Sequence, residues 1–283
     1  MTDHRAAARA LLSWYLEAGA NEAILNQAVD RARTRVTAQP PTPVSMPAPT
    51  SVAPLADAQP RHRASARQQG PAADTPLADA MTSARDLALK ARDLAELEAS
   101  LRAFEGCPLR VTATNTVFAA GTPGAPVMLV GEAPGADEDR AGEPFVGVSG
   151  RLLDQMLASI GLDRAKNAYI TNILPWRPPG NRQPTPAEVA VCLPFVQRHI
   201  ELAAPRLLVL VGGTAAKTLL DQREGIMRLR GRWFEWTGPS GGAPVPAIAT
   251  YHPAFLLRSS AQKANAWKDL VALKQRYASL CLD

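Results

Sequence analysis

The chain has 283 residues, 46% of them hydrophobic, and a formal net charge of +5. This length suits one large domain or two small ones, and the apolar residues suffice for a buried core. No apolar run approaches the ~18–20 residues that a membrane span needs, and the first residues lack the apolar stretch of a signal peptide. These features exclude an integral membrane protein and predict a soluble, cytoplasmic one, while the basic balance weakly favours a polyanionic partner.

Three segments differ in composition. Residues 1–36 have apolar side chains at helical spacing, among them Leu11, Leu12 and Trp14, which predicts a helical segment that docks on a protein partner or on the main domain. Residues 37–80 are rich in Pro and Ala and offer little to bury, which is typical of an extended, disordered linker. Residues 81–283 are predicted to form the main domain.

The main domain begins with a predicted helix over residues 83–104 and continues with alternating strands and helices. The expected strands cover residues 127–130, 168–174, 207–211 and 245–250, and the later helices cover residues 150–160, 186–203 and 260–279. Strands separated by helices indicate an α/β domain with a mostly parallel, helix-covered sheet. In such sheets the ligand binds at the carboxyl ends of the strands.

Three sequence motifs follow predicted strands. The first spans residues 131–147 and combines a Gly-rich turn with acidic residues and an aromatic one, the second spans residues 171–182, and the third spans residues 251–258. Each notable side chain has an ordinary explanation when taken singly: Phe145 as a core aromatic, Asn172 as a cap and His252 as a loop residue. Their occurrence together, each after a strand, favours a binding site.

The three motifs, in this order and at this spacing, resemble those of the family 4 uracil-DNA glycosylases of the uracil-DNA glycosylase superfamily. The resemblance covers about residues 100–280. It implies a three-layer α/β/α fold with a central, mostly parallel four-stranded sheet. It also implies an enzyme of base excision repair that flips uracil out of single- or double-stranded DNA and hydrolyses the bond joining that base to its sugar.

The same resemblance assigns roles around the flipped base. Phe145 matches the ring on which uracil stacks, and Asn172 matches the side chain that reads the amide edge of the base. His252 matches the residue near uracil O2, where negative charge builds as the base departs. These roles suit the chemistry, because a flipped base needs a stacking surface and hydrogen bonds to its pairing edge. Gly131 and Ala133 are expected beside the base.

The first motif offers two candidates for the residue that positions the attacking water. Related enzymes have a catalytic Asp where this chain has Ala133, so another acid must take that task. Glu138 is our first candidate and Glu132 our second. A carboxylate near the sugar suits the positive charge that develops there as the N-glycosidic bond breaks.

Contacts to DNA are expected from basic side chains and from an apolar wedge. The residues predicted to contact phosphates are Arg177, Arg182, Arg258 and Lys263. Leu256 and Leu257 are candidates for the wedge that fills the gap left by the flipped base, although one of them could instead anchor its loop in the core.

The cysteines do not form a disulfide framework, since three are present and they lie far apart in the sequence. Family 4 enzymes hold an iron–sulfur cluster with four cysteines, and Cys107 and Cys192 match two of these positions. Phe104 and Trp176 stand at the other two. Because a cubane cluster normally requires four thiolates, we expect no metal and no cofactor, with the two cysteines as remnants of a cluster site.

Other functions remain open at this stage. The runner-up is a non-catalytic member of the superfamily that binds uracil or DNA without cleaving it, which Ala133 would favour. A branch that bonds covalently to the sugar through a His in an insertion is disfavoured, because residues 139–150 contain no His. We further expect a monomer that associates with the nucleoid.

Overall fold

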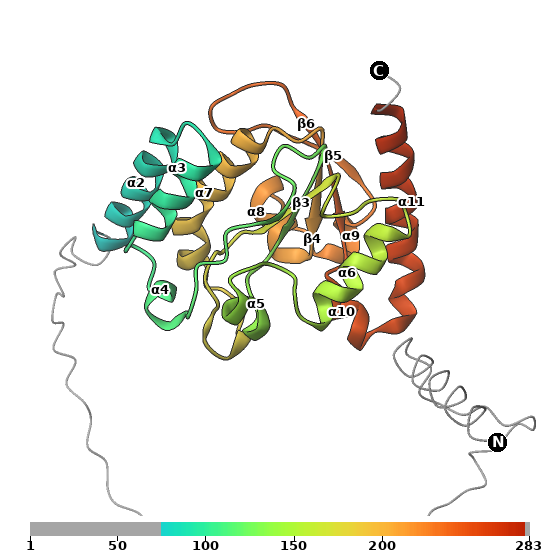
Figure 1. The fold of residues 1–283 in the computed structure, drawn as a ribbon, viewed down its shortest axis with the longest axis horizontal. Coiled ribbons are helices and arrows are strands. Elements are labelled where there is room, and N and C mark those ends of the chain that lie inside the picture. Colours follow the sequence, from blue (N-terminus) through green and yellow to red (C-terminus); the bar gives the residue numbers. More distant parts are fainter. Residues whose placement is uncertain (1–74, 281–283) are drawn as a thin grey trace, which may run out of the picture. The chain divides into compact units, whose positions relative to one another are not determined.

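The structure, a computed structural model, describes residues 75–280 (Figure 1). The predicted helical segment 1–36 and most of the predicted linker lie outside the described residues. The first described helix, α2 (Thr75–Lys90), begins within the range predicted to be linker. It packs against α7 (Pro186–Ala203), so the main domain extends further toward the N-terminus than residue 81.

The centre of the fold is a six-stranded sheet with the strand order β1-β3-β2-β4-β6-β5. Its strands are β1 (Ala120–Gly121), β2 (Val127–Gly131), β3 (Ala168–Asn172), β4 (Leu207–Val211), β5 (Trp233–Trp236) and β6 (Val245–Thr250). The four inner strands are parallel and correspond to the four strands predicted from the sequence. Two antiparallel edge strands, β1 and β5, complete the sheet.

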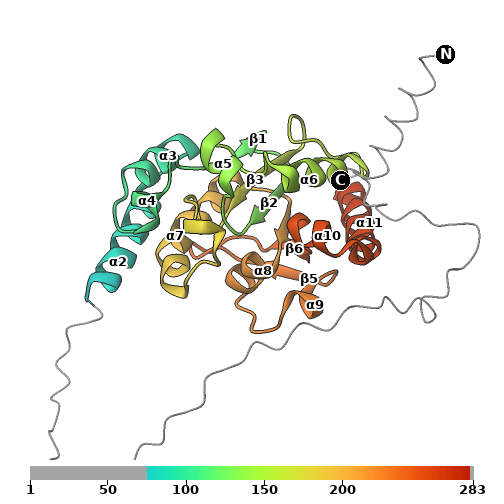
Figure 2. The ribbon, with the colours of Figure 1, turned by 90° about the horizontal axis from the view of Figure 1, so that it is seen from below.

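Helices cover both faces of the sheet (Figure 2). The remaining helices are α3 (Leu94–Ala103), α4 (Leu109–Thr112), α5 (Ala136–Ala141), α6 (Val148–Ala158), α8 (Gly213–Leu220), α9 (Ile226–Leu229), α10 (Pro253–Arg258) and α11 (Lys263–Leu280). Successive side chains of a strand point to opposite faces, so Met128 and Val130 pack with α3, α7 and α8, whereas Val127 and Leu129 pack with α6, α10 and α11. The predicted three-layer α/β/α fold is confirmed.

The helix predicted over residues 83–104 is two helices in the structure. The chain leaves the helical conformation after Lys90, and Asp93 caps α3 by accepting a hydrogen bond from the Glu96 backbone N–H at 2.8 Å. The freed Ala91 carbonyl accepts from two nitrogens of Arg198 on α7. The apolar spacing therefore predicted the buried face but not the break. Within residues 75–280 no helix is both long and apolar enough to cross a membrane.

A buried polar pair lies inside the layer formed by α7. His199 is 3% exposed, stacks on Phe118 with ring centroids 4.2 Å apart, and shares a hydrogen bond of 2.9 Å with the Tyr169 hydroxyl. Burial lowers the pKa of His199 to about 3 and raises that of Tyr169. The imidazole is therefore neutral in the folded protein throughout the physiological pH range.

This pair predicts a pH-dependent stability. The folded-state pKa of His199 lies below its unfolded value, so the unfolded state binds the proton first as the pH falls below about 6.5. The free energy of unfolding should then decrease by ~1.4 kcal/mol per pH unit from this group. His199→Gln keeps a polar side chain without the titration, and its urea midpoint should change less between neutral pH and about pH 5. Equal pH dependence of both proteins would contradict this.

Candidate active site

A cavity of about 450 Å³ opens at the carboxyl ends of the parallel strands. Its wall includes most of the predicted site residues, namely Glu132, Ala133, Glu138, Phe145, Asn172, Arg182, His252 and Arg258. They come from the ends of β2, β3 and β6 and from the segments that follow these strands. These segments are far apart in the sequence and meet because parallel strands of one sheet end at the same edge. The structure thus brings the three motifs together.

Gly131 ends β2 directly behind the cavity wall. A Cβ atom at this position would lie 2.3 Å from the Asn172 Oδ1 atom and 2.6 Å from the Phe145 Cζ atom. No side chain fits in that space, so a glycine is required for the amide and the aromatic ring to converge.

Asn172 lines the cavity and carries an unpaired polar atom. Asn172 is 6% exposed, and its buried Oδ1 atom has no hydrogen-bond partner among residues 75–280. Buried acceptors in proteins are rarely left unpaired, because the loss of hydration is not recovered. A ligand with an N–H group at this position would satisfy the amide oxygen.

The backbone of Phe145 is held in an unusual conformation. Its φ of 56° lies in the left-handed region, which is uncommon for a residue with a bulky side chain. The residue is 5% exposed, and its ring centroid lies 5.5 Å from that of His252. The aromatic ring and the imidazole therefore stand next to each other in the cavity wall.

His252 forms the N-cap of α10. Its Nδ1 atom accepts a hydrogen bond of 3.2 Å from the backbone N–H of Ala254, so the proton of the neutral ring lies on Nε2. Burial lowers the pKa of His252 to about 4, the charge of Arg258 lowers it further, and Glu138 acts in the opposite direction. At neutral pH the imidazole is an uncharged donor.

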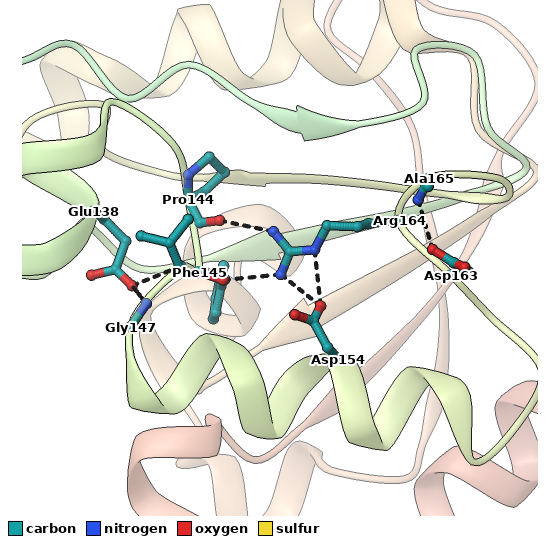
Figure 3. Close-up of polar contacts among 9 residues, drawn as sticks. Glu138, Pro144, Phe145, Gly147, Asp154, Asp163, Arg164 and Ala165 are labelled. Atoms are coloured by element: carbon teal, nitrogen blue, oxygen red, sulfur yellow. Dashed lines mark hydrogen bonds and ion pairs between the residues drawn. The ribbon is translucent and has the colours of Figure 1, made fainter.

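The two acidic candidates have different surroundings. Glu138 accepts three backbone hydrogen bonds: its Oε1 atom from Val146 at 3.0 Å and Gly147 at 2.9 Å, and its Oε2 atom from Gly135 at 3.0 Å. Both of its oxygens are thus engaged in holding the loop. Figure 3 shows the bonds to one of them, including the bond from Gly147. In Glu132, Oε2 accepts from the Thr214 hydroxyl, and Oε1 has no hydrogen-bond partner among residues 75–280.

The basic residues predicted to contact phosphates lie in different surroundings. Arg258 is exposed at the cavity and forms no ion pair within the described part of the chain. Arg182 is paired with Glu188 at 2.6 Å, which lowers the pKa of that carboxyl to about 2, and Arg177 donates to Asn181 at 2.7 Å. Lys263 does not line the cavity but a separate apolar groove beside α11.

The two leucines of α10 are distinguished by their burial. Leu256 is 1% exposed and belongs to the core between the sheet and α11, whereas Leu257 is 44% exposed. Leu256 therefore anchors the loop, and Leu257 is the side chain available to contact DNA.

Two contacts of the site were not anticipated from the sequence. Thr214, at the start of α8, donates to Glu132, and Arg164, in the loop between α6 and β3, donates to the Phe145 carbonyl oxygen at 2.9 Å. Thr214 follows the Gly212-Gly213 turn after a predicted strand, which was a usable signal. Arg164 lies outside all three motifs, and nothing in its position in the sequence predicted this contact.

Comparison with known proteins identifies the family. A family model described as the uracil DNA glycosylase superfamily matches residues 118–271. The chain belongs to the uracil-DNA glycosylase superfamily. The matched range contains all three motifs and the whole cavity wall, so the superfamily domain coincides with the part of the fold that carries the site.

Relatives of this superfamily member include several type-4 enzymes, in agreement with the resemblance seen in the motifs. The type-4 uracil-DNA glycosylase of Archaeoglobus fulgidus is 45% identical over 158 residues, which cover 53% of this chain and 76% of that protein. That of Pyrobaculum aerophilum is 38% identical over 182 residues, covering 63% and 91%, respectively. That of Thermotoga maritima is 40% identical over 154 residues, covering 54% and 77%.

These relatives correct the expectation of no cofactor. Type-4 uracil-DNA glycosylases are known to carry a 4Fe–4S cluster, so that expectation is wrong for this family. At the corresponding place, the buried Cys107 and Cys192 have their sulfur atoms 3.9 Å apart. Phe104 and Trp176 are buried in the same cluster of side chains. The described residues thus supply two of the four thiolates that a cubane cluster normally uses, an incomplete fit.

Proposed function

We propose that this chain hydrolyses the bond between uracil and deoxyribose in DNA, as its relatives are named for doing. The observation that carries the proposal is the buried, unpaired Oδ1 atom of Asn172 beside the Phe145 ring in the cavity. The test is incubation with a uracil-containing oligonucleotide followed by alkaline cleavage at abasic sites. Strand scission at the uracil position is expected, whereas binding without scission would favour a non-catalytic member of the superfamily.

Recognition of the base follows from the Asn172 amide. Its Oδ1 atom can accept from the N3–H of uracil, and its Nδ2 group can donate to O4. Cytosine has an acceptor at N3 and a donor at C4, so the same amide in this orientation opposes it. The Phe145 ring supplies the stacking surface that a flipped base requires. Asn172 thus selects uracil through hydrogen bonds to its pairing edge, and Phe145 stacks on the face of the ring.

His252 acts on the leaving group. As the bond breaks, negative charge develops on the uracil ring and reaches O2. The Nε2–H of the neutral imidazole is a fixed donor for that oxygen, and a donor placed where charge develops stabilises the transition state more than the bound substrate. Because the pKa of His252 is lowered to about 4, the group acts as a hydrogen-bond donor and not as a cation.

Glu132 is the better placed acid for the attacking water. Glu132 lines the cavity, its Oε1 atom has no hydrogen-bond partner in the described part of the chain, and Thr214 fixes the other oxygen. Glu138 was the first candidate from the sequence, but its two oxygens are occupied by backbone amides. We therefore assign Glu132 to the water and Glu138 to the loop.

This assignment predicts different effects for two matched variants. Glu132→Gln should lower the single-turnover rate by about 10- to 100-fold, because the amide holds a water but neither polarises it nor stabilises the positive sugar. Its urea midpoint should stay near that of the wild type. Glu138→Gln should lower the midpoint, because one oxygen that accepts backbone N–H groups becomes a donor. A larger loss of rate in a stably folded Glu138→Gln would reverse the assignment.

DNA binding is proposed to depend on the exposed Arg258 and on phosphate contacts near the cavity mouth. Neutralised phosphates release condensed counterions, so affinity should decrease with salt. Leu257 is proposed as the wedge in a duplex. Leu257→Ala should therefore lower excision from duplex DNA by about tenfold and affect single-stranded DNA much less. The single strand serves as the internal control, and equal losses on both substrates would contradict the wedge.

Three further properties belong to the same proposal. Action as a monomer is part of the proposal, since none of the roles assigned above requires a residue from a second copy. The DNA substrate supports association with the nucleoid. The apolar residues that recur at helical spacing in the sequence of residues 1–36 support a protein partner for that segment.

A further inference from the structure

We propose that Arg164 is a positioning residue that holds Phe145 in the geometry required to stack on uracil. This inference rests on the proposed function, since it concerns the stacking surface of the same cavity. Arg164 does not line the cavity and belongs to none of the three sequence motifs. It reaches the site through the backbone of the loop between α5 and α6, as Figure 3 shows.

Arg164 binds the loop at two successive carbonyl groups. Its Nη2 atom donates to the Phe145 carbonyl oxygen at 2.9 Å, and its Nη1 atom donates to the Pro144 carbonyl oxygen at 3.3 Å. Asp154 on α6 orients the guanidinium through Nε at 2.9 Å and Nη2 at 2.6 Å. The planar fork of an arginine suits this arrangement, because it can serve two carbonyls and one carboxylate at once.

The loop is held from the opposite side as well. Glu138 accepts from the backbone N–H groups of Val146 and Gly147, which follow Phe145. Gly150 of α6 leaves room for the turn, since a Cβ there would lie 1.9 Å from the Phe145 carbonyl oxygen. The left-handed conformation of a bulky residue is strained and persists only where the surroundings enforce it. Arg164, Glu138 and Gly150 provide that enforcement.

Arg164 is itself fixed at its own position. Its side chain is 21% exposed, and its backbone carbonyl oxygen accepts from the Thr122 hydroxyl at 3.2 Å. The neighbouring Asp163 caps the same loop by accepting from the Ala165 backbone N–H at 2.8 Å. A surface ion pair by itself stabilises a fold only slightly, so the pair with Asp154 does not explain why the guanidinium is held so firmly. The arrangement is explained by the strained residue that it holds.

The chain offers a matched control in Arg198. Its side chain is 22% exposed, donates to one backbone carbonyl oxygen and pairs with Glu201 at 3.1 Å, but it lies between α7 and the turn before α3, away from the cavity. Arg164→Ala and Arg198→Ala therefore remove similar interactions. Only the first should affect the presentation of the Phe145 ring.

The experiment measures single-turnover uracil excision and the affinity for product DNA that carries an abasic site. Arg164→Ala should lower the excision rate by about 10- to 100-fold, the scale for misplacing a substrate-positioning group. Its affinity for abasic DNA should stay unchanged, because no base is left to stack. Added guanidinium chloride at low concentration should restore part of the rate to Arg164→Ala and leave the rate of the control unchanged.

The remaining outcomes contradict either the positioning role of Arg164 or the proposed glycosylase function. Equal rates for Arg164→Ala and Arg198→Ala, or an equal loss of affinity for abasic DNA, would overturn the positioning role. Should circular dichroism show that Arg164→Ala is unfolded, Arg164→Lys decides: its single ammonium cannot serve both carbonyls, so a wild-type rate would overturn the role. A wild-type protein without uracil excision contradicts the proposed function instead.

Discussion

His252→Ala is expected to lower the single-turnover rate of uracil excision by ~10²–10³, the usual scale for losing one donor at developing negative charge. In the proposed mechanism, the Nε2–H group donates to an oxygen whose charge grows only as the bond breaks. Affinity for uracil-containing DNA should therefore change much less than the rate. Rapid-quench kinetics with enzyme in excess, together with binding isotherms, separate the two quantities.

The neutral state of His252 adds a second expectation. Burial lowers its pKa to about 4, so the donor is unchanged from neutral pH down to about pH 5, and protonation disturbs it only near pH 4. The His252 contribution to the rate should be constant over that range. His252→Gln, whose amide also donates, should recover part of the rate lost in His252→Ala. A wild-type rate in His252→Ala would show that the base departs without this donor.

Asn172→Asp is expected to lower uracil excision by about 10³-fold or more, because a site built around a hydrogen-bonded edge rejects a mismatched one strongly. The carboxylate replaces the donor that faces O4 with an acceptor and places a charge in a buried position. When protonated, the same group matches the cytosine edge better, so slow cytosine excision should appear. Single-turnover rates on uracil- and cytosine-containing oligonucleotides measure both effects.

A control separates recognition from folding. Asn172→Ala removes both hydrogen-bonding groups without introducing a charge, and it should lose uracil excision without gaining cytosine excision. Both variants need wild-type circular dichroism before their rates are compared. Unchanged base preference and rate in Asn172→Asp would mean that another group reads the base.

The fold and most of the cavity wall were predictable from the sequence. Four apolar runs separated by amphipathic segments define the parallel strands, and the strand-end rule gathers Glu132, Asn172 and His252 at one edge of the sheet. The edge strands were not predicted. β1 has two residues and thus no periodicity, and β5 is an aromatic-rich edge without a clear buried face.

The roles of the acids depend on tertiary contacts that no spacing reveals. Glu138 matches a family acid in the motif, yet the structure uses both of its oxygens on backbone amides. Glu132 acquires its orientation from Thr214, which is distant in the sequence. Likewise, Arg164 lies between α6 and β3 and donates to the Phe145 carbonyl oxygen, 19 positions earlier in the chain. Such contacts join separate segments and leave no local pattern.

The expectation about the cofactor failed for a different reason. It was drawn from Phe104 and Trp176 at two positions of this chain, whereas the type-4 relatives carry a cluster as a class. In the structure Trp176 donates to Thr116 at 3.1 Å, and Phe104 packs on Phe195 with centroids 5.2 Å apart. These contacts show how Phe104 and Trp176 pack in this chain. They do not bear on the cluster that the family binds.

The most direct test of the uracil pocket is a crystal structure of the protein with free uracil. The account predicts that uracil N3 lies within hydrogen-bond distance of the Asn172 Oδ1 atom, that O2 faces the His252 Nε2 atom, and that the ring stacks on Phe145. Uracil bound elsewhere in the cavity, with the Asn172 Oδ1 atom still unpaired, would contradict it.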